Sequence, residues 1–241
     1  MKTKIVLLLL IMSSVVALAQ NVKPLEGYSI TPPKFTGVQY AVPGNMEQNN
    51  SAIVTYLKEN VMFPEKAGKM LIQGTVVIGF VVTPQGELSE IKVINSVFPI
   101  LDDEVVRVLR TTSGMWEPGR INGETVAREQ EISLSFAITD MSKMDFTYLG
   151  KKYFSRATTL LFVKNEPAKA LRNFDKGIVL LPNDHGLLLL RGMTRFELGD
   201  KEGALKDWTR IKTLGGLESD VYIKMCSAMK GYEQMSQVLQ K

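Results

Sequence analysis

Alternating apolar and polar positions in the first half of the chain predict a β-hairpin. Gly74–Thr83 is rich in β-branched residues and places on one face Val76, Ile78, Phe80 and Val82. The stretch Thr83-Pro84-Gln85-Gly86 has proline at its second and glycine at its fourth position, as a type I turn prefers. Glu87–Asn95 follows this turn and is predicted to return as the second strand.

Two stretches around this hairpin have helical spacing. Met46–Glu59 places apolar residues at i, i+3 and i+4. A second helix opens at Leu101-Asp102-Asp103-Glu104, where carboxylates favour the positive end of a helix. The same acids could be read as a catalytic pair, but a helix start explains them better. The apolar positions of the two helices are Ile53, Tyr56 and Leu57, and Val105, Val106 and Leu109.

The last strand of this half has the cleanest alternation. In Val126–Ile138, apolar residues alternate with Glu131, Ser133, Ser135 and Ala137. One face is expected to pack on a core and the other to meet solvent, as in an antiparallel sheet. Residues 46–139 are therefore predicted to form an α+β domain, a small antiparallel sheet with two helices.

The second half shows only helical patterns. A self-comparison at an offset of 34 residues pairs Phe154 with Leu188, Ala170 with Ala204, Phe174 with Trp208 and Gly177 with Ile211. A small residue followed by an aromatic lets two antiparallel helices approach and then fills the gap between them. Residues 140–241 are predicted to be an all-α helical repeat with a closing helix at Val221–Leu239; a bundle with chance matches is the alternative.

The first residues are typical of a secretory signal peptide. Met1–Gln20 has two lysines, an apolar run and a small-residue site at Ala17-Leu18-Ala19, so residues 1–19 are expected to be removed. The alternative is a retained membrane anchor, which needs about 20 apolar residues, whereas serines interrupt a shorter run here. Residues 20–45 are rich in proline and glycine and are predicted to be an extended linker.

Composition excludes several classes of function. Removal of Lys2 and Lys4 lowers the formal net charge from +4 to +2. The sequence has no cluster of basic and aromatic residues, so we expect no nucleic-acid partner. The single cysteine, Cys226, lies among apolar residues and is expected to be buried and inert. The single histidine, His185, is expected at the surface.

No catalytic constellation is found. One histidine and one cysteine, far apart, cannot build a zinc site or a Cys/His dyad, and no nucleophile elbow or phosphate loop is present. Trp116 beside Pro118 is expected to pack at a corner of the fold. We therefore expect a protein that is not an enzyme, with no cofactor and no metal.

The second half resembles tetratricopeptide repeats. Arg191–Asp200 followed by Gly203–Trp208 is similar to one repeat, and Ala170–Phe174 with Pro182 to the one before it. Arg195 departs from the pattern, which usually has an aromatic or apolar residue there. The resemblance implies a surface that binds another protein or a peptide.

The first half resembles the C-terminal domain of TonB, the periplasmic energy transducer for outer-membrane receptors. The resemblance covers roughly residues 46–139. It implies that a receptor peptide adds as a strand to the edge of the sheet. The matching motifs are Tyr56-Leu57, Phe63-Pro64, Ile72–Val77, Val82–Gly86, Leu101–Glu104, Trp116–Gly119 and the strand Ile132–Ile138. The residues placed at this edge are Arg128, Gln130, Glu131, Ile132, Ser133, Leu134, Ser135 and Phe136.

The sequence thus predicts a periplasmic binding protein whose partner is an outer-membrane receptor peptide or another envelope protein. Its helical repeats would be a second docking surface. One alternative is an energy transducer anchored in the inner membrane, although the long proline-rich spacer and anchor histidine of that family are missing. Another is a scaffold that binds only through its repeats, with a sheet that forms homodimers edge to edge.

Overall fold

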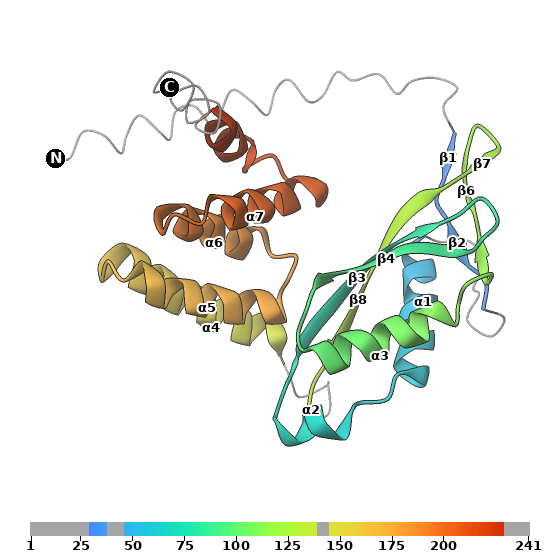
Figure 1. Cartoon of the computed structure of the whole chain (residues 1–241), viewed down its shortest axis with the longest axis horizontal. Helices are drawn as coiled ribbons and strands as arrows, with labels where there is room; N and C mark the ends of the chain where they lie inside the picture. The colour runs from blue at the N-terminus through green and yellow to red at the C-terminus, as the bar shows by residue number, and fades with distance from the viewer. Residues whose placement is uncertain (1–28, 38–45, 139–144, 229–241) are drawn as a thin grey trace, which may run out of the picture.

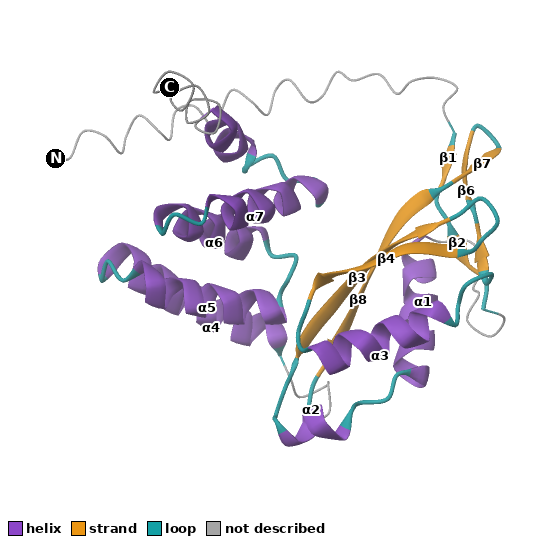
Figure 2. Ribbon diagram, in the orientation of Figure 1, coloured by secondary structure: helices purple, strands orange, loops and turns teal. Residues whose placement is uncertain are grey.

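The computed structural model describes residues 29–37, 46–138 and 145–228, which form an α+β half and a helical half (Figure 1). The expected signal peptide, most of the linker and the end of the closing helix lie outside the described residues. In the α+β half a twisted sheet packs against two helices, whereas the helical half contains helices alone (Figure 2).

The main sheet has three antiparallel strands in the order β4-β3-β8. β3 (Gly74–Val82) and β4 (Leu88–Asn95) form the predicted hairpin, closed by a bond from the Gly86 N–H to the Thr83 carbonyl of 2.9 Å. β8 (Arg128–Phe136) pairs with the other side of β3 over its whole length. The central strand β3 is buried at nearly every position.

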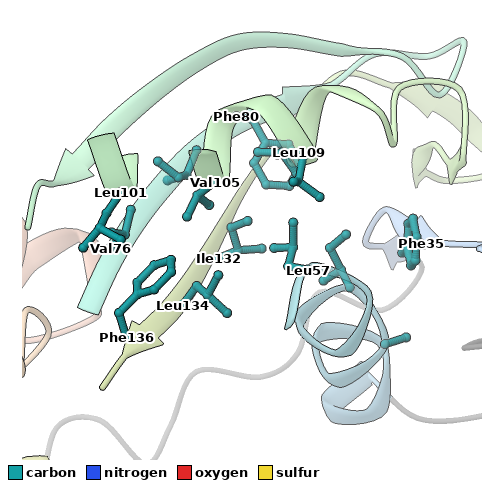
Figure 3. Packing of buried hydrophobic residues seen from close by; sticks show 14 of the residues in the cluster. Phe35, Leu57, Val76, Phe80, Leu101, Val105, Leu109, Ile132, Leu134 and Phe136 are labelled. Carbon is teal, nitrogen blue, oxygen red and sulfur yellow. The ribbon is translucent and has the colours of Figure 1, made fainter. Parts of the chain in front are cut away.

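Two long helices cover one face of this sheet. α1 (Met46–Asn60) lies over β8, and α3 (Pro99–Arg110) lies over β3 and β4. A short helix, α2 (Glu65–Lys69), follows α1 at the end of the sheet. Alternate residues of β3 and β8 meet the apolar stripes of both helices in one core (Figure 3). This core includes Leu57, Val76, Phe80, Leu101, Val105, Leu109, Ile132, Leu134 and Phe136.

Part of the predicted linker belongs to the α+β half. Residues 29–37 form β1 (Ile30–Thr31) and β2 (Lys34–Phe35), and Phe35 is fully buried between Tyr56 and Trp116. β1 pairs with β6 (Gly119–Ile121), which also pairs with β7 (Glu124–Val126), while β2 pairs with β5 (Trp116–Glu117). The domain thus begins before Met46.

The predicted strand Val126–Ile138 is two strands. Val126 belongs to β7 and pairs with Gly119, and the main strand β8 begins only at Arg128. Ile138 lies beyond β8 and is exposed. The alternation continued across Ala127 because β7 and β8 are both extended, so the pattern could not show that they pair with different neighbours.

The helical half contains two antiparallel hairpins. α4 (Phe146–Thr158) continues into a π-helical turn, η3 (Thr159–Val163), and packs on α5 (Pro167–Leu180). α6 (His185–Glu197) packs on α7 (Lys201–Thr213), and a further helix begins at residue 220. An aspartate side chain accepts an N–H in the first turn of α4, α6 and α7, which fixes where each begins.

Equivalent positions of the two hairpins have equivalent roles. α5 begins at Pro167 and α7 at Lys201, 34 residues later. Each hairpin buries a small residue and then an aromatic, all fully inaccessible: Ala170 and Phe174, Ala204 and Trp208. Gly192 allows this approach, since a Cβ there would lie 2.4 Å from the Trp208 ring nitrogen. The offset found in the sequence is therefore an offset between packed hairpins.

The helical half rests on the second face of the sheet. The Thr75 hydroxyl donates to the Leu180 carbonyl at 3.0 Å, and Arg210 forms a bidentate ion pair with Glu131 at 2.5 and 2.6 Å. Val77, on the same face, is fully buried. The expectation of one solvated face is therefore wrong for this part of the sheet, because helices distant in sequence cover it.

Candidate functional site

The outer edge of β8 is the first candidate site. In the part of the chain that the structure describes, β3 is the only strand paired with β8, so its other edge faces no strand. All eight residues predicted for the edge lie in β8, between Arg128 and Phe136.

The hydrogen bonds of β3 show which of its residues face β4. The Thr83 N–H donates to the Glu87 carbonyl at 2.9 Å, and the Thr75 carbonyl accepts from the Asn95 side chain at 2.8 Å. Both partners lie on the β4 side. Since N–H and C=O groups alternate in direction along a strand, the odd-numbered residues of β3 face β4 and the even-numbered residues face β8.

The register of β3 and β8 carries this alternation to the edge. Val76, Ile78 and Phe80 lie opposite Leu134, Ile132 and Gln130. In an antiparallel ladder, residues that exchange hydrogen bonds lie opposite each other. The even-numbered residues of β8 therefore direct their backbone groups at β3. The odd-numbered residues direct their backbone groups at the open edge; they are Glu129, Glu131, Ser133 and Ser135.

Sequence reasoning omitted Glu129 from this set. Arg128, Gln130, Ile132, Leu134 and Phe136 are on the strand, but their backbone groups are used inside the sheet. The same alternation that separates the two faces could have indicated Glu129, since it continues the series of Glu131, Ser133 and Ser135. The sequence did not indicate whether the odd- or the even-numbered residues of β8 direct their backbone groups outward.

The two faces of β8 differ in chemistry. On the face toward α1, Ile132, Leu134 and Phe136 are buried in the core. On the other face, Ser135 contacts the Thr75 hydroxyl at 2.9 Å, and Glu131 is held by Arg210. A strand added at this edge would have apolar neighbours on one face and polar neighbours on the other.

Glu104 positions the segment Met62-Phe63, which lies near Phe136 at the end of β8. Its carboxylate accepts the Met62 N–H at 2.9 Å and two bonds from Arg107. The hydrogen bond from Arg107 lowers the pKa of Glu104. The neighbouring Phe63 is partly exposed and its ring centroid lies 5.9 Å from that of Phe136.

The acidic residues at the start of α3 do not form a catalytic pair. Asp102 is buried and accepts bonds from the Ser96 hydroxyl and the Val97 N–H. Asp103 is exposed, and Glu104 is bound to Met62 and Arg107. Each of the two bonded carboxylates has its own structural partners.

The second candidate site is a hollow in the helical half. It has a volume of about 430 Å³ and lies between η3, α6 and the helix that begins at residue 220. Its wall is mostly aromatic and methionine side chains, the composition typical of ligand and peptide sites. The residues that line it are Leu161, Phe162, Asn165, Met193, Phe196, Glu197, Trp208, Tyr222 and Met225.

The remaining residues of interest have structural roles. Trp116 is buried against Phe35 and Phe80, as expected of a corner aromatic. Cys226 is buried, as expected. His185 is partly exposed, with its Nδ1 2.6 Å from a Glu218 oxygen.

Two features are absent from the described ranges. No group of three or more potential metal ligands was found in residues 29–37, 46–138 and 145–228. Over the same residues, no helix has the length and apolar character needed to span a bilayer.

Comparison with known proteins bears on the α+β half. Residues 59–138 match the family model described as the Gram-negative bacterial TonB protein C-terminal domain. This match covers β3, β4, α3 and β8, and supports a TonB C-terminal domain in the α+β half. The helical half lies outside it. No curated protein sequence matches the chain.

Two solved structures are similar to part of the chain, both NMR solution structures of the Helicobacter pylori TonB-CTD. One is 17% identical and has a TM-score of 0.32, with 37% of this chain and 94% of that chain covered. The other is 16% identical and has a TM-score of 0.33, with 44% and 95% covered.

Proposed function

We propose that this chain is a periplasmic, non-enzymatic binding protein for outer-membrane transport, which takes up an extended receptor peptide at the edge of β8. The observation that carries the proposal is the open edge, with the backbone groups of four alternate residues directed outward. The TonB C-terminal match of residues 59–138 supports the same class of function.

The edge suits reversible binding. A peptide beside Glu129–Ser135 would pair with the outward residues through backbone bonds, each of which contributes about 0.5–1.5 kcal/mol net. Main-chain bonds of this kind give affinity, and alternate side chains give specificity. Binding would therefore need no catalytic group and no large conformational change.

Proline substitution separates binding from folding. The Ser133 N–H faces outward, so Ser133→Pro should leave the sheet folded and weaken peptide binding about ten-fold, since proline removes that donor. The matched control is Gln130→Pro, whose N–H faces β3 and whose loss should destabilise the sheet. Circular dichroism reports folding, and calorimetric titration with an alternating Val/Thr peptide reports binding.

Backbone NMR of the full chain decides where the peptide binds. Saturable shifts in residues 128–136 during titration are the expected result. Shifts confined to the helical half, with these residues unchanged, would remove strand addition and favour the scaffold alternative.

Cell fractionation tests the alternative of a membrane-anchored transducer. The proposal expects a soluble periplasmic form whose intact mass corresponds to a start at Gln20. A full-length mass in the inner-membrane fraction would favour the transducer instead.

We further propose that the helical half is a tetratricopeptide-like second docking surface. The observation that favours it is the aromatic hollow, beside which Phe162 is 63% exposed. Large exposed apolar side chains around a hollow are common at protein interaction sites.

A pair of neighbouring substitutions tests this second surface. Phe162→Asp places a charge in the wall of the hollow and should reduce capture of an envelope partner. Val163→Asp is the control, because Val163 is 78% exposed but does not line the hollow. Equal capture by both variants and the parent chain would exclude the hollow as the docking surface.

A further inference from the structure

We propose that the β8 edge selects peptides with a basic side chain, and that Glu129 is the residue that recognises it. This inference rests on the proposed strand addition and specifies the class of peptide. It comes from the different surroundings of the two glutamates whose backbone groups face the open edge, Glu129 and Glu131.

The charge of Glu131 is already matched by the helical half. Both of its carboxylate oxygens accept from Arg210, and the Arg210 guanidinium also donates to the Asn183 side chain at 2.7 Å. A bidentate pair of this kind is among the stronger charge-assisted contacts. Glu131 therefore has little capacity left for a peptide cation.

Glu129 keeps its charge available. Its side chain is 79% exposed, and its ion-pair partner is Lys92, whose Nζ lies 3.8 Å away and whose side chain is itself 60% exposed. Exposed pairs at such a distance contribute little and exchange readily. A peptide cation can therefore compete with Lys92 for this carboxylate.

The geometry of strand addition places a peptide side chain beside Glu129. Residues in register on neighbouring strands have side chains on the same face, with Cα atoms about 4.5–5.5 Å apart. This holds whether the peptide runs parallel or antiparallel to β8. The peptide residue next to Glu129 therefore projects on the polar face, on the side of the Glu131–Arg210 pair.

The complementary peptide is extended and amphipathic. Its apolar side chains lie on the face of Ile132, Leu134 and Phe136, and its polar side chains lie on the face of Glu129. A lysine or arginine beside Glu129 gains a cross-strand ion pair, whereas an acidic residue is repelled. Opposite charges in this arrangement favour binding by a few-fold, and like charges oppose it.

The test compares two capped peptides of alternating valine and threonine, with one central threonine replaced by lysine or by glutamate. We expect the lysine peptide to bind the full chain about three- to ten-fold more tightly at low salt. The preference should shrink as salt rises, because exposed charges are screened.

Charge-changing variants assign the preference to one residue. Glu129→Lys should reverse it and Glu129→Gln should remove it. Glu124→Lys, an exposed change at the β6–β7 hairpin, should leave it intact. Arg210→Gln frees the carboxylate of Glu131 and should strengthen the preference for lysine, which a loss of stability alone would not do.

The outcomes separate this inference from the proposed function. Equal binding of both peptides to the parent chain and to Glu129→Lys would overturn charge selection while strand addition stands. If neither peptide binds and residues 128–136 show no NMR shifts, both proposals are overturned.

Discussion

At the scale of single residues, Phe35 shows that a segment without periodicity can complete a core. It lies in a stretch whose prolines and glycines predict a linker, yet its ring is 5.5 Å from Tyr56 and 5.3 Å from Trp116. Two short strands, β1 and β2, hold the arm in place. The buried ring of Phe35 and these two strand pairings distinguish the arm from a tether.

Phe35→Ala should lower the free energy of unfolding of the α+β half by about 3–5 kcal/mol, the usual loss for truncating a buried aromatic. Urea unfolding followed by backbone NMR signals of the α+β half measures it, because tryptophan fluorescence would also report Trp208 in the helical half. Thr31→Ala, an exposed change in the same arm, is the control and should have little effect. A Phe35→Ala protein as stable as the control would mean that the arm does not contribute to the core.

Asp207 explains why Arg195 departs from the repeat pattern. Asp207 is 3% exposed, and its carboxylate accepts two bonds from Arg191 and one from Arg195, at 2.6–3.0 Å. Burial raises the pKa of Asp207, while the arginines act in the opposite direction. The repeat pattern treats each position by itself and expects an aromatic or apolar residue where Arg195 stands. It contains no information on the buried Asp207 that pairs with this arginine.

Asp207→Ala should therefore destabilise the helical half. It removes the buried carboxylate that Arg191 and Arg195 share and leaves them only the half-exposed Asp175 in common. The cost is about 2–4 kcal/mol, below the usual value for a fully buried pair because both guanidinium groups keep some exposure. Thermal melts of the full chain measure the loss. Glu202→Ala removes an exposed carboxylate from the same helix and should change the melting temperature far less.

At the scale of elements, local patterns were readable and distant pairings were not. The β3–β4 hairpin was predicted because its turn and both strands are contiguous. The pairing of β1 with β6 was not, since the Ser29 N–H reaches the Asn122 side chain across 93 residues. The division of the last strand into β7 and β8 was missed for the same reason.

The candidate site was predictable to the same depth. Alternation along β8 correctly separated the core side chains Ile132, Leu134 and Phe136 from the polar ones. It could not tell which backbone groups face outward, because that depends on how β3 pairs with β4. The alternation also could not show that Arg210, 79 residues away, forms an ion pair with the Glu131 carboxylate.

Trp208 is the element-scale counterpart of Phe35. It is fully buried, stands over Gly192 and stacks on Tyr222 at 5.2 Å, so it joins α6, α7 and the helix after them. Trp208→Ala should unfold the helical half, with a loss of about 3–5 kcal/mol. Helical signal during a thermal melt shows it, with exposed Tyr148→Ala as control. A melt like that of the control would argue against the paired-hairpin packing.

At the scale of the whole molecule, the two halves are joined through the Arg210–Glu131 pair. A double-mutant cycle of Arg210→Met and Glu131→Gln should give a coupling energy of about 1–2 kcal/mol, measured by urea unfolding. The exposed pair Lys69–Glu65 provides a reference cycle, expected to give about 0.3–0.5 kcal/mol. Additive effects at Arg210 and Glu131 would show that this pair does not join the halves energetically.

The unpaired outer edge of β8 has a consequence for hydrogen–deuterium exchange. Amides of β3 lie between two strands, and the strand is buried at nearly every position. They should therefore exchange slowest, at a rate set by global unfolding. Along β8 the rates should alternate, with Ser133 and Ser135 fast and Ile132 and Leu134 slow. A bound peptide would slow exchange only at the outward amides, such as those of Ser133 and Ser135. The exchange rate at every second amide of β8 would therefore measure the fraction of protein that has bound peptide.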